Sequence, residues 1–175
     1  VGGLSIIGTS GIVKPFSHEA FVDSVRKECS VAFALSPSRL VMNSGAKSEA
    51  YIKALYPQLP PQAFVHYGNF IGDALSIAHE MHFASVSLGI MVGKAVKLAE
   101  GNLDTHSKKV VMNKDFLHKV AYEVGTSSDT HALIDELTMA RELWGIPSIQ
   151  ERDRLLLALL QRCHSVTASQ LSPNT

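Results

Sequence analysis

Apolar residues in this chain follow two alternating patterns. Short apolar runs without polar alternation are typical of strands buried on both faces. These runs occupy residues 4–7, 39–42, 63–67 and 85–91. Between and after them, apolar residues recur every three or four positions, which predicts helices. These stretches cover residues 17–35, 47–56, 70–81 and 92–100. Because strands that alternate with helices favour a parallel sheet, we expect an α/β fold: a three-layer, Rossmann-like, mostly parallel sheet.

The character of the chain changes after residue 107, where helical periodicity takes over. Three further helices are predicted, over residues 114–124, 129–144 and 148–165. Residues 109–112 are a weaker candidate for one more short strand, and the polar tail at 169–175 is expected to be disordered. We therefore expect an α/β ligand-binding core over residues 1–112 and a C-terminal helical segment over 113–168, packed on the same domain.

Charge and cysteine content narrow the choice of partners. The chain has 16 basic and 16 acidic residues, so its formal net charge is zero. Nucleic-acid-binding domains carry a basic excess and membrane surfaces attract polybasic segments, so we expect neither partner. The longest apolar run, Ala84 to Gly93, is well short of the roughly 20 residues of a membrane span. Cys29 and Cys163 form no CxxC pair and the histidine spacing builds no metal site, so we expect reduced thiols, no metal and a cytoplasmic protein.

Glycine and polar residues interrupt the pattern where strands pass into helices. Such junctions are where α/β sheets bind ligands. The junction residues are therefore our candidates for binding cofactor or substrate. They are Gly8, Thr9, Ser10, Gly11, Gly45, Lys47, Glu49, Asn69, Gly72, Gly93, Lys94, Lys97, Thr105 and Ser107.

Two of these turns have alternative explanations. The turn from Gly8 to Gly11 could hold an anionic or polar ligand with its backbone amides, or could be a tight turn that uses glycine for positive φ. Its spacing does not match the GxGxxG fingerprint. The turn from Ser44 to Glu49 lacks the first glycine and the Gly-Lys-Ser/Thr order of a P-loop, which excludes that kind of nucleotide binding. It could still present a helix N-terminus to a ligand.

The remaining junctions also leave alternatives open. Helix capping alone would explain Asn69. Glycine in a first helical turn costs up to about 1 kcal/mol relative to alanine, so Gly72 indicates close approach by a ligand or by another backbone segment. Lys94 and Lys97 lie near a predicted helix N-terminus, where positive charge is unfavourable. They indicate either an anionic partner, such as carboxylates, or a solvated helix face.

Four ordered blocks resemble one protein family. The blocks are Gly-Gly-Leu-Ser-Ile-Ile-Gly-Thr-Ser-Gly-Ile-Val-Lys-Pro (2–15), Asn-Phe-Ile-Gly (69–72), Val-Gly-Lys-Ala-Val-Lys-Leu-Ala-Glu-Gly (92–101) and Thr-His-Ser (105–107). Together they are similar to the cobalt-precorrin-5B C1-methyltransferases of anaerobic cobalamin biosynthesis. The resemblance is close over about residues 2–107 and looser over the helical remainder. Four blocks in the same order are much more specific than any one of them.

The resemblance implies methyl transfer from S-adenosylmethionine to carbon 1 of a corrin-like ring, giving cobalt-precorrin-6A. Cobalt would enter only as part of this corrinoid substrate, whose carboxylates suit Lys94 and Lys97 as charge partners. His106 would be the catalytic candidate, accepting a proton or binding a carboxylate. Orientation of the sulfonium methyl can supply most of the catalysis, so no dedicated nucleophile is required.

The resemblance also implies a partner. Because the chain begins at Val1 and opens directly on a predicted strand, we expect a piece of a longer polypeptide whose N-terminal half is its partner. Whether the chain also forms a homo-oligomer is left open by the sequence. The Lys-Gly-Tyr-Thr-Thr-Gly-like motif of that N-terminal half is absent from this chain.

A second departure follows Thr-His-Ser, where the family tends to have an Ala-Asp-x-Arg-type stretch. This chain reads Lys-Lys-Val-Val-Met-Asn-Lys at 108–114 instead. The alternative function is therefore a non-catalytic tetrapyrrole-binding or assembly module with the same fold. An unrelated flavodoxin-like or Rossmann-like nucleotide binder is a third interpretation, weakened by the missing GxGxxG and P-loop motifs.

Overall fold

The centre of the fold is a small parallel sheet. A computed structural model describes residues 17–36, 38–106 and 110–171. Its strands are β1 (Leu40–Asn43), β2 (Phe64–His66) and β3 (Val86–Gly89), in the order β2-β1-β3. In the register, Val41 lies opposite Phe64 on one side and Ser87 on the other. The predicted α/β fold with a parallel sheet is confirmed, and the predicted strand at 4–7 lies outside the described residues.

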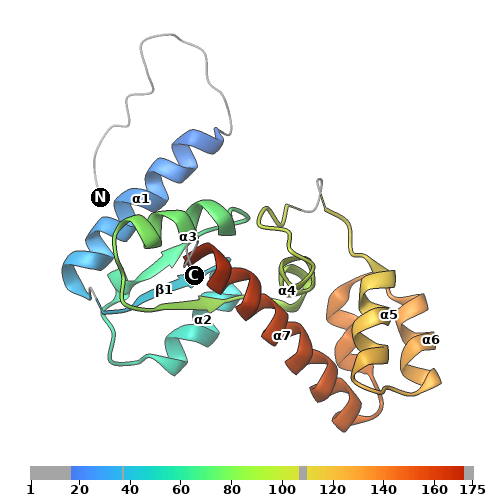
Figure 1. The fold of residues 1–175 in the computed structure, drawn as a ribbon. Helices are drawn as coiled ribbons and strands as arrows, with labels where there is room; N and C mark the ends of the chain where they lie inside the picture. The colour runs from blue at the N-terminus through green and yellow to red at the C-terminus, as the bar shows by residue number, and fades with distance from the viewer. Residues whose placement is uncertain (1–16, 37, 107–109, 172–175) are drawn as a thin grey trace.

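Helices cover both faces of this sheet. They are α1 (His18–Leu35), α2 (Ala46–Leu55), α3 (Ile71–Glu80) and α4 (Val92–Ala99), with a short 3-10 turn η1 (Pro61–Ala63) before β2. Figure 1 shows α1 and α3 on one side of the sheet and α2 on the other. The central strand β1 is buried at all of its positions, as expected for a parallel strand between two helical layers. The helix predicted to begin after Ser17 does so, and the Ser17 hydroxyl accepts the Ala20 amide (3.3 Å).

The C-terminal helices join the same hydrophobic core. They are α5 (Lys114–Glu123), α6 (Ser128–Glu136), the 3-10 helix η2 (Ala140–Gly145) and α7 (Ile149–Leu171). Helix α7 starts beside α5 and α6 and runs back across α4 to α3 (Figure 1). Leu155, Leu159 and Cys163 form its buried stripe, one turn apart. The Cys163 thiol also donates a hydrogen bond to the Ala95 carbonyl of α4 (3.1 Å), which fixes α7 against the helix that follows β3.

Three predicted elements of the C-terminal part are wrong. The predicted helix over 129–144 breaks after α6, because the Glu142 carboxylate accepts the amides of Thr138 (2.8 Å) and Met139 (3.2 Å) and starts η2 separately. Residues 110–112 form no strand. Helix α7 continues through Leu171, so the expected disorder does not hold at 169–171; residues 172–175 lie outside the described part.

Neither cysteine is placed for reactivity. Cys29 and Cys163 are both free and buried, in α1 and α7. Burial raises the pKa of Cys29 to about 12 and that of Cys163 to about 11, so both stay protonated near neutral pH. They act as ordinary packing residues of the core.

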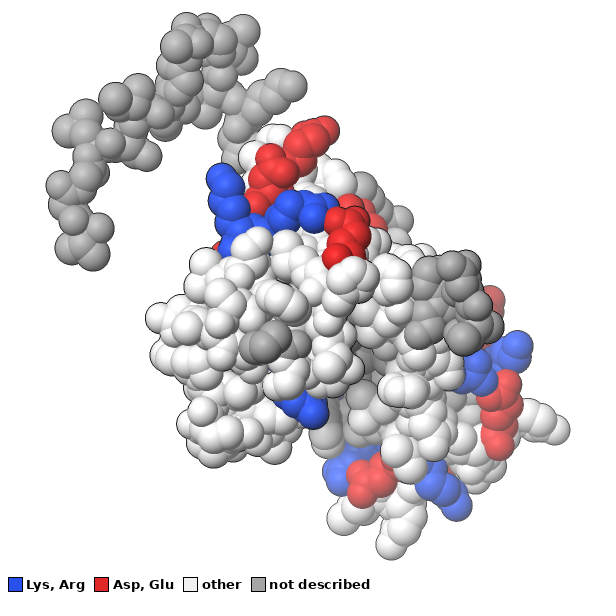
Figure 2. All heavy atoms as spheres, turned by 60° about the vertical axis from the view of Figure 1, so that its left-hand side comes forward, with Lys and Arg blue, Asp and Glu red and all other residues white. Residues whose placement is uncertain are grey.

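Charged side chains of both signs share the surface. In Figure 2, basic and acidic residues lie next to one another in small groups, and a broad area between the groups carries uncharged residues. Arg26 and Glu80 form one ion pair between exposed side chains (2.6 Å). Within the described part of the chain, no helix is both long and apolar enough to cross a membrane.

Candidate ligand-binding cavity

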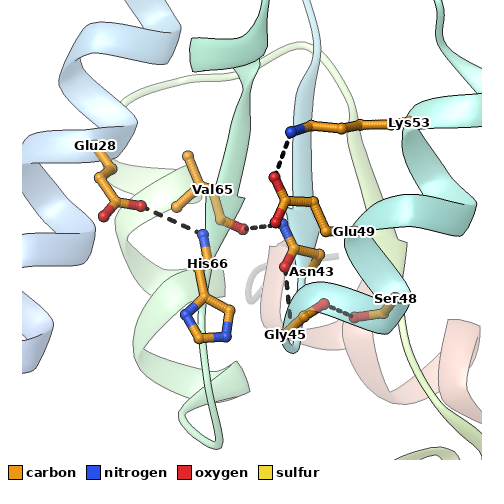
Figure 3. A network of polar contacts seen from close by, with 8 residues as sticks. All are labelled: Glu28, Asn43, Gly45, Ser48, Glu49, Lys53, Val65 and His66. Atoms are coloured by element: carbon orange, nitrogen blue, oxygen red, sulfur yellow. Dashed lines mark hydrogen bonds and ion pairs between the residues drawn. The ribbon is translucent and has the colours of Figure 1, made fainter.

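The turn after β1 is tied to the neighbouring strand. The Asn43 side chain donates to the Val65 carbonyl (3.3 Å) and accepts the Gly45 amide (3.2 Å), as Figure 3 shows. The Ser48 hydroxyl donates to the Gly45 carbonyl (2.9 Å). Gly45 has a φ of +152°, and α2 begins at the next residue without a side-chain cap. The strand end is therefore held by side chains of its own turn.

The two charged candidates of that turn do not face a cavity. Lys47 is exposed on α2. The Glu49 carboxylate forms an ion pair with Lys53, one turn further along the same helix (Figure 3). Both side chains thus have the ordinary role of a solvated helix face.

The turn after β2 uses a backbone segment, rather than a side chain, to start its helix. Helix α3 begins at Ile71 with Phe70 at the capping position and no side-chain cap, so the prediction that Asn69 caps it is wrong. Instead, the Gly72 amide donates to the Leu103 carbonyl (3.2 Å), and the Thr105 amide donates to the Asn69 carbonyl (3.0 Å). The loop before residue 106 therefore satisfies the helix end.

This contact decides between the two explanations for Gly72. A Cβ atom at Gly72 would lie 3.1 Å from the Cβ of Leu103, which is tighter than an ordinary contact. The glycine leaves room for the Leu103 side chain, in the loop whose carbonyl accepts the Gly72 amide. Gly72 therefore positions the loop that carries Thr105, and it does not itself face the cavity described below.

Lys94 connects the turns at the ends of two strands. It lies in the first turn of α4, and its ammonium donates to the carbonyls of Gly68 (2.6 Å) and Ser44 (3.3 Å). Burial, followed by the nearby Lys97 charge, lowers the pKa of Lys94. Removing a charge from water in this way is costly unless it is paired or hydrogen-bonded. The partly buried lysine therefore marks a place where an anion would be favourable.

Lys97 is buried beside Lys94, and its position in α4 differs from the prediction. Because α4 is short, Lys97 falls in its last turn, so the prediction that Lys97 lies near a helix N-terminus is wrong. Its ammonium donates to the Thr105 carbonyl (3.3 Å). Neither lysine is part of a solvated helix face, because Lys97 is buried and Lys94 is half-buried.

These elements enclose one side of a cavity of about 480 Å³. Five of the predicted residues lie in its wall, and they are Asn69, Gly93, Lys94, Lys97 and Thr105. The cavity lies at the carboxyl ends of the parallel strands, which is where the sequence placed it. We call this side of the cavity the polar wall.

The other predicted residues are placed elsewhere or are not described. Gly45, Lys47, Glu49 and Gly72 lie outside the cavity wall. The His106 amide donates to Asp104 Oδ1 (3.1 Å), and His106 follows Thr105 without lining the cavity. Gly8, Thr9, Ser10, Gly11 and Ser107 lie outside the described residues.

The remaining lining residues of the cavity were missed by the sequence reasoning. They are Met91, Val110, Val111, Met112, Thr138, Met139 and Ala140. We call this set the apolar wall. Its two main segments are the stretch after residue 106, where the Val110 amide donates to the His106 carbonyl (3.0 Å), and the break between α6 and η2. The apolar run at 110–112 was a usable signal, but the assumed continuous helix concealed the break.

The charges in the wall are all positive. Among the described residues, two lysines and no carboxylate line the cavity. An ammonium has three N–H donors; the carbonyls described above take two from Lys94 and one from Lys97. Each lysine therefore keeps a donor for a carboxylate or phosphate oxygen. No group of three metal-ligating side chains occurs within the described residues.

Fold and cavity together define a class of protein. A parallel α/β sheet with a basic and apolar cavity at its carboxyl edge is an arrangement typical of small-molecule-binding domains. The cavity volume lies within the range of about 300–1,000 Å³ that is usual for such sites.

Comparison with known proteins gives the family. A protein of Prosthecochloris aestuarii named cobalt-precorrin-5B C(1)-methyltransferase is 38% identical over 166 residues, covering 94% of this chain. Proteins of the same name from Nitratidesulfovibrio vulgaris and a Geobacillus species are 41% identical over 71% of the chain and 32% identical over 93%. No family model and no solved structure matches the chain. The chain is therefore homologous to the C-terminal portion of the cobalt-precorrin-5B C(1)-methyltransferases, which confirms the resemblance.

The chain spans less than half the length of these relatives. It covers 45% of the Prosthecochloris aestuarii and Geobacillus proteins and 32% of the Nitratidesulfovibrio vulgaris protein. The cavity described here is thus a feature of one part of a longer family polypeptide.

Proposed function

We propose that this chain supplies the substrate-carboxylate site of a corrinoid methyltransferase. The complete protein would transfer a methyl group from S-adenosylmethionine to carbon 1 of cobalt-precorrin-5B and release cobalt-precorrin-6A. The observation that carries the proposal is the pair Lys94 and Lys97, held close together in the wall of a cavity whose described lining residues include no carboxylate.

The polar wall would bind and orient the substrate. The free N–H donors of Lys94 and Lys97 would bind carboxylates at the edge of the macrocycle, as charge-assisted hydrogen bonds. Asn69 and Thr105 lie in the same wall, and their backbone contact (Thr105 amide to Asn69 carbonyl, 3.0 Å) keeps the two loops together. A fixed pair of cations would therefore set the position of the ring relative to the methyl donor.

The apolar wall would contact the uncharged part of the ligand and exclude water. Val110, Met112 and Met139 provide this surface. In the transfer, the bond from sulfur to methyl breaks as the bond to carbon 1 forms, and S-adenosylhomocysteine leaves. The protein's main contribution would be alignment of the two reactants, since a pre-organised geometry can supply roughly 7–11 kcal/mol of the barrier. His106, next to Thr105, stays a candidate for accepting a proton or binding a carboxylate.

The test is calorimetric titration of this chain with two corrinoids that differ in charge. Cobyrinic acid carries free carboxylates at the ring edge, and cobinamide carries amides in their place. The proposal expects cobyrinic acid to bind and cobinamide to bind at least about tenfold more weakly, because each lost charge-assisted hydrogen bond costs about 1.5–3 kcal/mol. Equal binding of the two, or binding of neither, would contradict it.

A second titration separates catalysis from binding alone. S-adenosylhomocysteine is added to the corrinoid-loaded chain and to a relative of full length, such as the Prosthecochloris aestuarii protein. The proposal expects the full-length relative to bind the nucleoside in competition with S-adenosylmethionine. If this chain binds cobyrinic acid but the full-length relative binds no S-adenosylhomocysteine, the result would favour the alternative of a non-catalytic tetrapyrrole-binding module.

A further inference from the structure

The two outer edges of the sheet, at β2 and β3, differ in how the described elements cover them. At the β2 edge, the His66 amide donates to the Glu28 carboxylate of α1 (3.3 Å), and α1 packs against β2 (Figure 3). At the β3 edge, no further strand pairs within the described residues, and β3 packs mainly against β1 and α2. The β2 edge is therefore covered by α1, whereas no described strand pairs with the outer edge of β3.

Strand β3 also lacks the features that normally protect an exposed edge. Proteins blunt open edges with charged residues, proline or bulges. The segment Val86–Gly89 and the following Ile90 contain neither charge nor proline. An open and apolar edge of this kind is a template for another segment of chain.

Two apolar hollows flank this edge and meet at Ile90. One, of about 160 Å³, lies between α2 and β3 and includes Tyr51, Leu55 and Leu88. The other, of about 200 Å³, lies between the start of α4 and α7 and includes Trp144 and Leu160. Several of these side chains are well exposed: Leu55 by 74%, Trp144 by 58% and Leu160 by 52%. We call this continuous surface the β3 face.

No charged residue lines either hollow within the described part of the chain, although the Arg152 guanidinium lies 5.4 Å from the centroid of the Trp144 ring. The β3 face therefore does not suit a nucleic acid or a small anion, and it has the composition of the core of a protein interface. Contiguous exposed apolar surface on a protein of this kind usually marks an interaction site.

We propose that the β3 face is the docking surface for the remaining portion of the family polypeptide. The full-length relatives contain more chain outside the matched region than within it, since the match covers 45% or less of their length. That additional chain must pack somewhere, and the β3 face is an apolar surface that the described residues of this chain leave uncovered. The inference rests on the homology and not on the proposed ligand of the cavity.

Hydrogen exchange in a joined protein tests this directly. The portion of the Prosthecochloris aestuarii relative that precedes its match is linked to this chain as one polypeptide, and amide exchange at β3 is compared with that in the chain alone. The proposal expects exchange at β3 and in the α2 turn at Tyr51 to slow by about tenfold or more in the joined protein. Unchanged exchange at β3 would overturn it.

Charge substitutions on the β3 face separate docking from folding. Leu160→Glu is expected to restore the fast exchange of β3 in the joined protein and to lower its Tm, while the Tm of the chain alone stays the same because Leu160 is already half exposed. Tyr122→Glu on α5, at a side chain that is 81% exposed and outside both hollows, is the matched control and should change neither protein.

A second copy of this chain is the rival occupant. If the chain alone formed a concentration-dependent dimer that Leu160→Glu dissociates, and if the joined protein gave no additional protection, the proposal would be overturned in favour of self-association. None of these measurements involves a corrinoid. They can therefore contradict docking at the β3 face while the cavity binds its ligand, and ligand binding can be absent while docking is observed.

Discussion

The two walls of the cavity are built in different ways. The polar wall is made by the turns that follow parallel strands, and its main groups are fixed by hydrogen bonds: Lys94 to Gly68 and Ser44, and Lys97 to Thr105. The apolar wall is made by an irregular segment and a break between two helices. The polar wall therefore follows from the α/β fold, whereas the apolar wall depends on how the C-terminal helices pack onto it.

The largest expected effect concerns Gly68, whose carbonyl accepts a hydrogen bond from Lys94 of the polar wall. Gly68 has a φ of +60°, and a Cβ there would lie 2.9 Å from the Phe21 ring. Gly68→Ala combines backbone strain with overpacking, so we expect the free energy of unfolding to fall by about 2–4 kcal/mol. Gly125→Ala is the matched control, since Gly125 has a similar φ of +68° and open space around it; it should cost about 1 kcal/mol. Equal losses in urea unfolding would mean that the Phe21 contact is unimportant.

The next effect concerns the charges. Lys94→Met and Lys97→Met keep the apolar stems and remove the ammonium groups, so each should weaken binding of cobyrinic acid by roughly 10- to 100-fold. Lys47→Met is the control, because Lys47 is exposed on α2 outside the cavity wall. Titration calorimetry measures all three. Unchanged affinity in both cavity variants would remove the basis for the polar wall as the anion site.

The pH dependence of binding should report Lys94. Its pKa is lowered from the ordinary 10.5, chiefly by burial. Below the lowered pKa the ammonium is charged and binds a carboxylate. As pH rises through the lowered pKa, the charge and the affinity are lost, at a pH below that for an exposed lysine. The affinity of cobyrinic acid should therefore fall on the alkaline side, and Lys94→Met should flatten that fall. A fall that is the same in the variant would assign it to another group.

The smallest effect concerns the segment that carries part of the apolar wall. Hydrogen bonds from Thr138 and Met139 lower the pKa of Glu142 from the ordinary 4.5. The contribution of these bonds is present above the ordinary value and is lost as pH falls through the lowered pKa. The protection factors of the Thr138 and Met139 amides, which correct for the intrinsic exchange rate at each pH, should fall in acid, and Glu142→Gln should lower them at neutral pH. Glu136→Gln, one helix earlier, is the control and should leave both amides unchanged.

The comparison of the walls also explains what the sequence could predict. The strand-to-helix alternation predicts the parallel sheet, and the position of Lys94 directly after a strand predicts its place at the sheet edge. The partner of Gly72 could not be assigned, because the choice between a ligand and a backbone segment depends on Leu103, which is distant in sequence. The apolar wall was missed because helical periodicity over 129–144 does not reveal that Glu142 caps a new helix start.

Lys97 illustrates a further limit of sequence reasoning. Lys97 follows Lys94 closely, so the sequence predicts that it lies near the N-terminus of the helix. Because α4 is short, Lys97 instead lies in its last turn. Its burial depends on contact with the loop at Thr105, which no local pattern encodes. Lys97 thus lines the cavity, and its role in ligand binding stays a prediction.

The central claim is that both walls face one anionic ligand. The most direct measurement is the change in backbone amide NMR shifts of this chain on titration with cobyrinic acid. The account predicts saturable shifts in both walls together, at Asn69, Lys97 and Thr105 on one side and at Met112 and Met139 on the other. Shifts confined to one wall, or centred on α2 around Lys47, would contradict it.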